Sequence, residues 1–544
     1  MGWLADETGL ERTAANYVPL TPLSHLQRAA HVFAQDTAVI YGGVRHSYSA
    51  YYDRCTRLAA ALAGMGVKPG DVVATLLPNI PAQAEAHFGV PACGAVLNTI
   101  NIRLDVDTVA YIFDHGGAKV ALVDSEVLAL AEAAKAQMEG DGPILIEVPD
   151  AEARISASGR HVTYEDLLAE APPAFDWIMP EDEWESLALN YTSGTTGRRK
   201  ACMLTHGNFL FELGVATDEL ESLFETEGAS TLLFLPLAHV FARIIQVGCV
   251  MSRTRLGHSP DIKNLLPDLQ SFRPTFVLAV PRVFEKVFNT ASQKAAAEGR
   301  GKVFDRATET AIAWSRAQDR GRVPLRVRAE HAAFSRLVYG KLLAALGGSC
   351  TFAVSGGAPL GERLGHFYRG VGLTILEGYG LTETTAALTV NLPGAHKIGT
   401  VGRPLPGTAV RVADDGELLF RGGQVFAGYW GNESATAETL ERDGWFHSGD
   451  VGEVDDEGFV RITGRKKELM KTSGGKYIAP AKIEGRLKNH SLIQEAVTVA
   501  DTRNYASALI AIDPEELANW AGLKNLPATM DSDELRAEIQ SHVD

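Results

Sequence analysis

Residues 187–200 read LALNYTSGTTGRRK, an apolar run that leads into a loop of glycines, hydroxyls and basic side chains. The apolar run, Leu187–Thr192, has the length and composition of a buried strand. In the loop, glycines let backbone N–H groups converge on an anion, hydroxyls add donors and Lys200 adds a positive charge. The pattern predicts a strand followed by a triphosphate-binding loop, and a polar surface turn is the alternative. The spacing between Gly194 and Lys200 is not that of a Walker A loop, which disfavours a P-loop kinase.

The chain before this loop alternates between short apolar runs and helical stretches. The runs Val72–Leu77, Lys119–Val123 and Pro143–Val148 have the character of strands, and Tyr51–Met65 carries apolar residues at helical spacing. Strands that alternate with helices predict an α/β fold around a mostly parallel sheet. The acidic, proline-rich segment Glu170–Glu185 then predicts a connection between subdomains.

The chain after the loop changes character twice. Residues 284–348 are rich in helix formers, a second strand–helix region begins at Thr351, and residues 398–462 carry the frequent glycines and short alternating runs of a small β-rich module. A chain of 544 residues is too long for one core, so several domains are expected. We predict a large N-terminal domain hinged to a small, mobile α+β domain. The expected bounds are 1–466, with subdomains at about 1–185, 186–397 and 398–466, and 467–544.

Composition indicates a soluble globular protein with no general affinity for nucleic acid. Hydrophobic residues make up 46% and charged residues 22%, which is an ordinary globular balance. The 67 acidic residues outnumber the 51 lysines and arginines, so the formal net charge is −16 and a general basic footprint is absent.

Three features place the protein in the cytoplasm. The five cysteines are scattered and form no CxxC pair, which favours buried thiols in a reducing compartment over disulfides or a zinc site. The N-terminus lacks the basic and apolar regions of a signal peptide. No apolar run approaches the ~20 residues that span a bilayer. Contact with a membrane surface stays open, as does a homodimer.

Two further motifs suit a nucleotide. Residues 378–384 read GYGLTET, in which glycines flank an aromatic ring and a hydroxyl and a carboxylate follow. Such glycines allow a flat ring to pack closely, and the hydroxyl and carboxylate suit a phosphate with its Mg²⁺. Residues 444–450 read GWFHSGD, and an aspartate after a tight turn can accept two hydrogen bonds from a ribose diol. Alone, each motif is equally consistent with an ordinary strand end or turn.

A basic cluster follows the β-rich module. Residues 463–476 read TGRKKELMKTSGGK. Clusters of this kind are usually solvated faces. This one lies between the β-rich module and a new αβ pattern, so we interpret it as a hinge beside an anionic ligand.

Together, these four motifs resemble the AMP-forming adenylating enzymes, a family that includes acyl-CoA synthetases, luciferases and carrier-loading adenylation domains. Their order and separation match across residues 20–540. The segments LPLAHVFAR at 235–243 and VSGGAPL at 354–360 are similar to long-chain fatty acid–CoA ligases. The segment NTINIRL at 98–104 is more similar to medium-chain and methylthiopropionate-type ligases, which suggests a mosaic chain.

The resemblance implies ligation of a medium- or long-chain fatty acid to coenzyme A, with ATP, Mg²⁺ and an acyl-adenylate intermediate. It implies catalytic roles for five residues and a magnesium ligand in Glu383. The five are His239, Thr382, Glu383, Lys200 and Arg465. It also implies a larger set that binds the nucleotide or the pantetheine arm of CoA. That set is Thr192, Ser193, Gly194, Thr195, Thr196, Gly197, Lys200, Gly356, Gly357, Ala358, Glu377, Gly378, Tyr379, Gly380, Thr382, Asp450, Arg465, Lys467, Ser473, Gly474 and Gly475.

Three departures from the family pattern affect these expectations. Arg199 and Ala201 replace the usual proline and glycine beside the loop lysine, and Arg243 stands where some long-chain relatives have an aromatic gate. The family also has a lysine near its C-terminus that contacts the carboxylate and α-phosphate, and no segment here matches it. The small domain is therefore expected to be incomplete, with adenylation weakened and thioester formation from supplied acyl-AMP retained.

Two other functions stay open. An adenylating enzyme that loads a carrier protein would have little affinity for free CoA. A nucleotide- and acyl-binding protein without turnover would bind AMP or ATP tightly and release no product.

Overall fold

The computed structural model describes residues 13–192, 198–260, 264–475, 477–488, 490, 492–524 and 526–543. Their largest sheet has seven strands in the order β18-β8-β7-β4-β3-β5-β6, of which β7, β4, β3, β5 and β6 run parallel. The central strands are buried on both faces by helices, as parallel sheets require. The strands are β3 (Val72–Leu76), β4 (Val96–Thr99), β5 (Ala118–Asp124), β6 (Ile144–Val148), β7 (Ser186–Tyr191), β8 (Ala201–Thr205) and β18 (Gly428–Tyr429). The N-terminal helices are α1 (Leu23–Val32), α2 (Tyr48–Gly64), α3 (Pro81–Ala92), α4 (Val106–Gly116), α5 (Leu128–Ala136) and α6 (Tyr164–Glu170).

Two smaller sheets continue the large domain. One has the order β2-β1-β10-β9 and the other the order β11-β12-β13-β14-β15. Their strands are β1 (Thr37–Tyr41), β2 (Val44–Ser47), β9 (Ser230–Leu233), β10 (Arg255–His258), β11 (Phe276–Ala279), β12 (Phe352–Ser355), β13 (Thr374–Tyr379), β14 (Thr389–Val390) and β15 (Arg403–Pro404). The accompanying helices are α7 (His206–Glu219), α8 (Glu221–Phe224), α9 (Val240–Met251), α10 (Leu265–Phe272), α11 (Pro281–Ala297), α12 (Gly301–Asp319), α13 (Leu325–Phe334), α14 (Gly340–Ala345) and α15 (Glu362–Val371).

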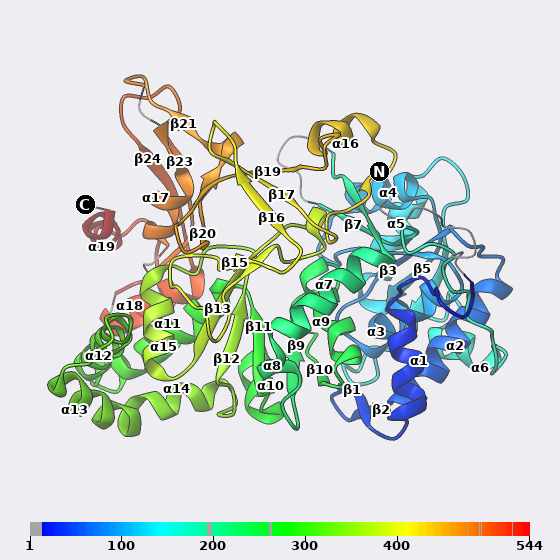
Figure 1. The fold of residues 1–544 in the computed structure, drawn as a ribbon. Coiled ribbons are helices and arrows are strands. Elements are labelled where there is room, and N and C mark those ends of the chain that lie inside the picture. The colour runs from blue at the N-terminus through cyan, green and yellow to red at the C-terminus, as the bar shows by residue number, and fades with distance from the viewer. Residues whose placement is uncertain are drawn as a thin grey trace.

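The β-rich module is an antiparallel sheet above the junction of the two helical halves (Figure 1). Its strands are β16 (Ala409–Val412), β17 (Glu417–Arg421), β19 (Phe446–Val454) and β20 (Val460–Arg465), and α16 (Glu433–Thr439) precedes β19. The C-terminal elements lie beside it, over α11 and α15 in Figure 1. They are β21 (Met470–Lys471), β22 (Tyr477–Ile478), α17 (Pro480–Leu487), β23 (Ile493–Val499), β24 (Ser507–Ile512), α18 (Pro514–Lys524) and α19 (Asp533–Val543).

The α/β class and the mixed architecture predicted from the sequence are confirmed. The strands predicted before residue 150 appear as β3, β5 and β6, and the predicted helix at 51–65 appears as α2. All five cysteines are buried and free, and their burial agrees with the sequence prediction.

The two halves on either side of residue 185 share their sheets. Strand β4 pairs with β7, and β1 pairs in parallel with β10 through Val39 and Leu256. The connection at 170–185 therefore joins two parts of one interleaved body. It brings the carboxyl ends of β7 and β13 and the start of α9 to one place, where the predicted motifs meet.

Candidate active site

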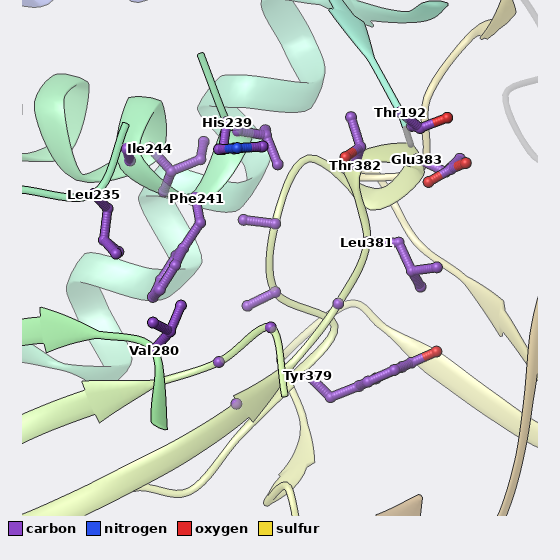
Figure 2. A pocket seen from close by; sticks show the side chains of 18 of the residues that line it. Thr192, Leu235, His239, Phe241, Ile244, Val280, Tyr379, Leu381, Thr382 and Glu383 are labelled. Atoms are coloured by element: carbon purple, nitrogen blue, oxygen red, sulfur yellow. The ribbon is translucent and has the colours of Figure 1, made fainter. Parts of the chain in front are cut away.

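A single cavity of about 1050 Å³ collects residues from the predicted motifs. Most of the separate stretches predicted to carry chemistry contribute to its wall, from Asn101 to Glu468. In Figure 2, Thr192, Thr382 and Glu383 lie on one side, Leu235 and Val280 lie on the other, and His239 lies between them. The cavity thus has a polar end and an apolar end, and its volume is at the upper limit for a site that holds one small ligand.

The polar end is built by Tyr379 at the end of β13 and Asp450 in β19. The Tyr379 hydroxyl donates a 2.6 Å hydrogen bond to Asp450 Oδ2. Arg465, opposite Asp450 on β20, places its Nε 3.4 Å from Oδ1. Burial raises the pKa of Asp450 above its ordinary value, while Tyr379 and Arg465 favour its charged form. An aromatic face, a carboxylate and a guanidinium at one site can hold the base, sugar and phosphate of a nucleotide.

Thr382 and Glu383 lie in a short 3-10 helix, Thr382–Thr384, that borders the same end. Glu383 Oε1 accepts a 2.8 Å hydrogen bond from the Tyr429 hydroxyl, and the backbone N–H of Phe426 donates to the Glu383 carbonyl. The carboxylate is thereby fixed next to the Thr382 hydroxyl. Sequence reasoning missed Tyr429, because a lone tyrosine in the β-rich module carries no local signal.

The loop after β7 contributes its two ends. The Thr192 N–H donates to the Lys200 carbonyl at 2.9 Å, which closes the base of the loop. Lys200 Nζ lies 4.7 Å from the centre of the Tyr429 ring, a cation–π contact that directs the charge to the cavity. Ser193, Gly194, Thr195, Thr196 and Gly197 lie outside the described residues.

His239 precedes the first turn of α9 and faces the cavity between its two ends. Asn101 Nδ2 lies 3.4 Å from its Nε2. Burial by the surrounding protein, with a smaller effect of Arg199, lowers the pKa of His239 below 6.5. The imidazole is therefore neutral at pH 7 and above. Sequence reasoning noted the segment around Asn101 only as a family resemblance.

The apolar end is a tunnel between α7 and α9. Both helices present lining residues at spacings of three and four, so one face of each helix forms a wall. The α7 wall is Glu212, Leu213, Ala216 and Thr217, continued by Leu220 just after the helix, and the α9 wall is Val240, Phe241, Ala242, Ile244, Ile245 and Gly248. Eight residues of helix correspond to about 12 Å of wall. Phe224, beyond Leu220, borders the far end.

Glu212 joins the tunnel wall to the polar end. Its side chain is 1% exposed, and Oε1 accepts a 2.9 Å hydrogen bond from the Ala387 N–H. Burial holds the pKa of Glu212 well above its usual range. Ala387 ends the segment that begins at Thr382, so this bond positions the segment against α7. No motif in the sequence pointed to Glu212.

Some of the other predicted residues border the cavity, and the rest lie away from it. Gly356 and Gly357 border it, whereas Ala358 is exposed outside it and Glu377 turns to accept a 2.9 Å hydrogen bond from the Leu360 N–H. Burial raises the pKa of Glu377 to about 7. Lys467 borders the cavity at its rim. Ser473, Gly474 and Gly475 lie beyond that rim, in the turn between β21 and β22.

Arg243 lies behind the tunnel wall. It is 1% exposed, its Nη1 donates a 2.8 Å hydrogen bond to Asn190 Oδ1, and it stacks over Phe209. Burial lowers the pKa of Arg243 to about 9. Phe241, two residues earlier, is an aromatic side chain that does border the tunnel (Figure 2).

The residues at the polar end fit a magnesium ion bound with a nucleotide. Mg²⁺ takes one or two protein carboxylates, keeps several waters and uses phosphate oxygens for the rest. Glu383 supplies one carboxylate that borders the cavity and is held by Tyr429. When bound there, the ion would neutralise phosphate charge.

We expect the contribution of His239 to disappear only in acid. Replacing His239 by glutamine should slow thioester formation from supplied acyl-AMP roughly tenfold at pH 7.5, the size of one lost hydrogen bond. Because burial lowers the pKa of His239, the ratio of wild-type to variant rate should stay nearly constant above pH 7 and fall in more acidic solution. A ratio that already falls above pH 7 would contradict the neutral imidazole. Taking the ratio removes the titration of other groups from the comparison.

Comparison with known proteins identifies the family. The family model described as AMP-binding enzyme matches residues 26–430. The chain is 46% identical over 471 residues to the long-chain-fatty-acid–CoA ligase FadD15 of Mycobacterium tuberculosis, over 85% of this chain and 76% of that protein. It is 32% identical over 531 residues to the peroxisomal acetate/butyrate–CoA ligase AAE7 of Arabidopsis thaliana, over 91% and 84%.

Solved structures share the fold across nearly the whole chain. The anthranilate CoA ligase AuaEII, solved with anthranoyl-AMP, superposes with a TM-score of 0.74 at 20% identity, covering 98% of this chain and 92% of that one. An ATP-bound chimera, RpMatB-BxBclM, gives a TM-score of 0.72 at 22% identity, covering 97% and 92%. The family match spans most of the cavity wall described above, and the chain therefore belongs to the AMP-binding enzymes.

Proposed function

We propose that this protein joins a medium- or long-chain fatty acid to coenzyme A in two steps, through an acyl-adenylate. The proposal rests on one observation. The same cavity has a polar end suited to binding a nucleotide and an apolar tunnel about 12 Å long between α7 and α9. The named relatives that act on fatty acids support the choice of substrate class.

In the first step, a carboxylate oxygen attacks the α-phosphorus of ATP and diphosphate leaves. Tyr379 stacks on the adenine, Asp450 accepts hydrogen bonds from the ribose, and Thr382 donates to the α-phosphate. Lys200 and Arg465 screen negative charge as the two anions meet, and Glu383 would hold a magnesium ion that adds to this screening.

In the second step, the thiol of CoA gives its proton to water, the resulting thiolate attacks the acyl carbonyl, and the bond to the phosphate breaks so that AMP leaves. His239, neutral and placed between the two ends of the cavity, orients the carbonyl and the incoming thiol. Rotation of the domain that begins at Lys467 brings Ser473, Gly474 and Gly475 to the pantetheine arm. One mobile domain thus serves both steps, and it excludes water from the mixed anhydride.

The proposal places the reaction in the cytoplasm. Among the described residues, no helix is both long enough and apolar enough to cross a bilayer.

Mass spectrometry of the products tests the proposal. The full chain is incubated with ATP, Mg²⁺, CoA and a ladder of acids from butyrate to stearate, and a parallel sample receives synthetic acyl-AMP and CoA. Acyl-CoA in both samples is the expected result for a complete ligase. Acyl-CoA from acyl-AMP alone would support the second step and show that adenylation is lacking. Acyl-AMP transferred to a carrier protein but not to CoA would overturn the choice of acceptor.

The far end of the tunnel sets a length limit at Gly248. A Cβ there would lie 3.2 Å from Leu213 Cδ2 on the opposite wall, so a larger side chain must displace Leu213 and narrows the end of the bore. Gly248→Val should lower kcat/KM for decanoate, whose extended chain is about as long as the 12 Å wall, at least tenfold and leave hexanoate nearly unchanged, since losing room for even one methylene costs about 1–3 kcal/mol. Gly214→Val, where a Cβ meets nothing within 4 Å, is the matched control on α7. An equal loss for both acids would place the acyl chain elsewhere.

A further inference from the structure

The segment 382–387, which borders the polar end of the cavity, carries backbone strain. Thr385 has a φ of 53° and Ala386 has a φ of 110°, values in the left-handed region that residues with a Cβ rarely adopt. Neither residue is a glycine, so the segment keeps this conformation only while its surroundings hold it there. Thr382 and Glu383 come directly before the strained pair and lie together at the polar end (Figure 2).

The β-rich module holds one side of this segment. Thr385 Oγ1 donates a 2.8 Å hydrogen bond to the Gln424 carbonyl, and the Phe426 N–H donates a 2.8 Å hydrogen bond to the Glu383 carbonyl. The contact between Gln424 Nε2 and the Ala387 carbonyl is longer, at 3.5 Å. The module therefore fixes the start of the segment more firmly than its end.

Helix α7 holds the end of the segment through Glu212. Glu212 Oε1 accepts a 2.9 Å hydrogen bond from the N–H of Ala387, which directly follows the strained pair. One turn earlier, Asn208 Nδ2 donates hydrogen bonds of 2.7 Å to the Gly423 carbonyl and 2.9 Å to the Val425 carbonyl. Because Asn208 anchors α7 on the β-rich module, Glu212 reaches the segment from a fixed base.

The carboxyl of Glu212 is incompletely hydrogen-bonded and lies on the tunnel wall. The side chain borders the cavity and is 1% exposed, and among the described residues its Oε2 has no hydrogen-bond partner. Burial raises the pKa of Glu212 well above its usual range, and the Ala387 N–H opposes that shift. A buried polar group with unused positions gains from contact with water. Water along the tunnel therefore competes with Ala387 for the carboxyl, whereas an acyl chain excludes water and offers no hydrogen bond.

We propose that Glu212 is a positioning residue for adenylation, through which an acyl chain in the tunnel holds Thr382 and Glu383 in place for the α-phosphate and its magnesium. The proposal rests on the two-step ligase function given above. With water along the tunnel, the carboxyl can leave the Ala387 N–H, and relief of the backbone strain then favours release of the segment. With an acyl chain along the tunnel, the Ala387 N–H is the partner that remains. The acid and the nucleotide therefore bind cooperatively, and each raises the affinity for the other by the same factor.

Calorimetric titration of the full chain with Mg²⁺ and α,β-methylene-ATP tests this coupling without turnover, because the methylene bridge keeps diphosphate from leaving. Decanoate, whose extended chain is about as long as the 12 Å wall, should lower the Kd of the analogue at least about fivefold. Acetate, which carries the same carboxylate but is too short to cover the wall, should leave the Kd unchanged. Decanoate that binds without changing the Kd would overturn the role of Glu212. Absence of decanoate binding would overturn the proposed substrate class as well.

Substitutions at position 212 separate the hydrogen bond from the volume of the side chain. Glu212→Met keeps the length and removes the acceptor, so it should cancel the effect of decanoate and slow adenylation about tenfold, the size of one lost hydrogen bond. Glu212→Gln keeps an acceptor oxygen for the Ala387 N–H and should stay within about threefold of the wild type in both measurements. Glu219→Met, the same change on α7 at a residue that does not border the cavity, is the matched control. Equal impairment by glutamine and methionine at position 212 would contradict the role of the acceptor.

Ala386→Gly gives a readout that a purely structural anchor would not move. Glycine adopts a φ of 110° without the steric penalty that alanine carries, so the active form of the segment needs less support. Added to Glu212→Met, it should therefore raise the adenylation rate at least about threefold and restore part of the effect of decanoate. Ala297→Gly, at the exposed end of α11, is the control in the same background. Recovery by both glycines, or by neither, would overturn the role of the strain.

Melting curves and the second step distinguish positioning from support of the fold. Glu212→Met should melt at the same temperature with and without Ala386→Gly, although the two proteins adenylate at different rates. Thioester formation from supplied acyl-AMP, which needs no diphosphate departure, should be slowed less than adenylation. Rates that simply follow the melting temperature across the variants, with both steps equally slowed, would assign Glu212 to the stability of the fold and overturn the proposal.

Discussion

Gly380→Ala is expected to abolish acyl-adenylate formation. A Cβ at position 380 would overlap the backbone carbonyl of Ala386 and lie 2.9 Å from Ala387 Cα, and backbone cannot yield as a flexible side chain can. The segment from Thr382 to Ala387 would have to move as a unit, and with it the Thr382 hydroxyl and the Glu383 carboxylate. A displacement of about 1 Å at reacting groups costs on the order of 100-fold in rate.

The measurement is AMP and diphosphate release from ATP with saturating fatty acid. Loss of at least 100-fold is expected, with Gly394→Ala as the control because a Cβ there meets nothing within 4 Å. Near-normal release by Gly380→Ala would mean that the segment does not position the α-phosphate. Circular dichroism and a melting curve distinguish local displacement from loss of the fold.

Among substitutions that preserve the shape of the side chain, Glu383→Gln is expected to reduce the rate of adenylation the most. Glutamine keeps the volume and can still accept from the Tyr429 hydroxyl, but it removes the charge that would hold magnesium. Losing one electrostatic contact to the transition state costs on the order of 100- to 1000-fold in kcat. The Mg²⁺ concentration needed for half-maximal adenylation should rise by at least tenfold.

The second step provides the internal comparison. Thioester formation from supplied acyl-AMP needs no diphosphate departure, so Glu383→Gln should slow it far less than adenylation. Tyr429→Phe removes only the hydrogen bond that orients the carboxylate at 2.8 Å, and partners of metal ligands are typically worth about 10- to 100-fold. An equal loss in both steps would assign Glu383 a structural role.

Sequence reasoning located the polar end of the site but not its supports. Tyr379, Asp450 and Arg465 were predicted from three separate motifs, and the structure brings them within hydrogen-bonding or ion-pairing distance. Glycine-rich turns with polar residues can be recognised from a short stretch of sequence, because their chemistry depends on residues that are neighbours in the chain. Tyr429, Asn101 and Glu212 act through partners that are 46, 138 and 175 residues away, so no local pattern could reveal them.

The tunnel illustrates a second limit. Arg243 stands where some long-chain relatives have an aromatic gate, yet Phe241 borders the bore and Arg243 is buried behind it. Residues two apart on a helix point roughly 200° apart, so knowledge of the helix alone does not say which of them faces the substrate. The answer depends on how α9 rotates against α7, and that is decided by packing across the whole domain.

The pairing of β1 with β10 has a consequence for how the protein folds while it is being synthesised. Val39 leaves the ribosome early, and its partner Leu256 is made about 200 residues later. At ~5–20 residues per second, β1 waits for roughly 10–40 s with only the short hairpin strand β2 beside it. Nascent chains of this length expose a free strand edge that can recruit a neighbouring chain. Yield in the cell should therefore respond to translation speed and to chaperones that hold nascent chains, even for variants whose finished fold is fully stable.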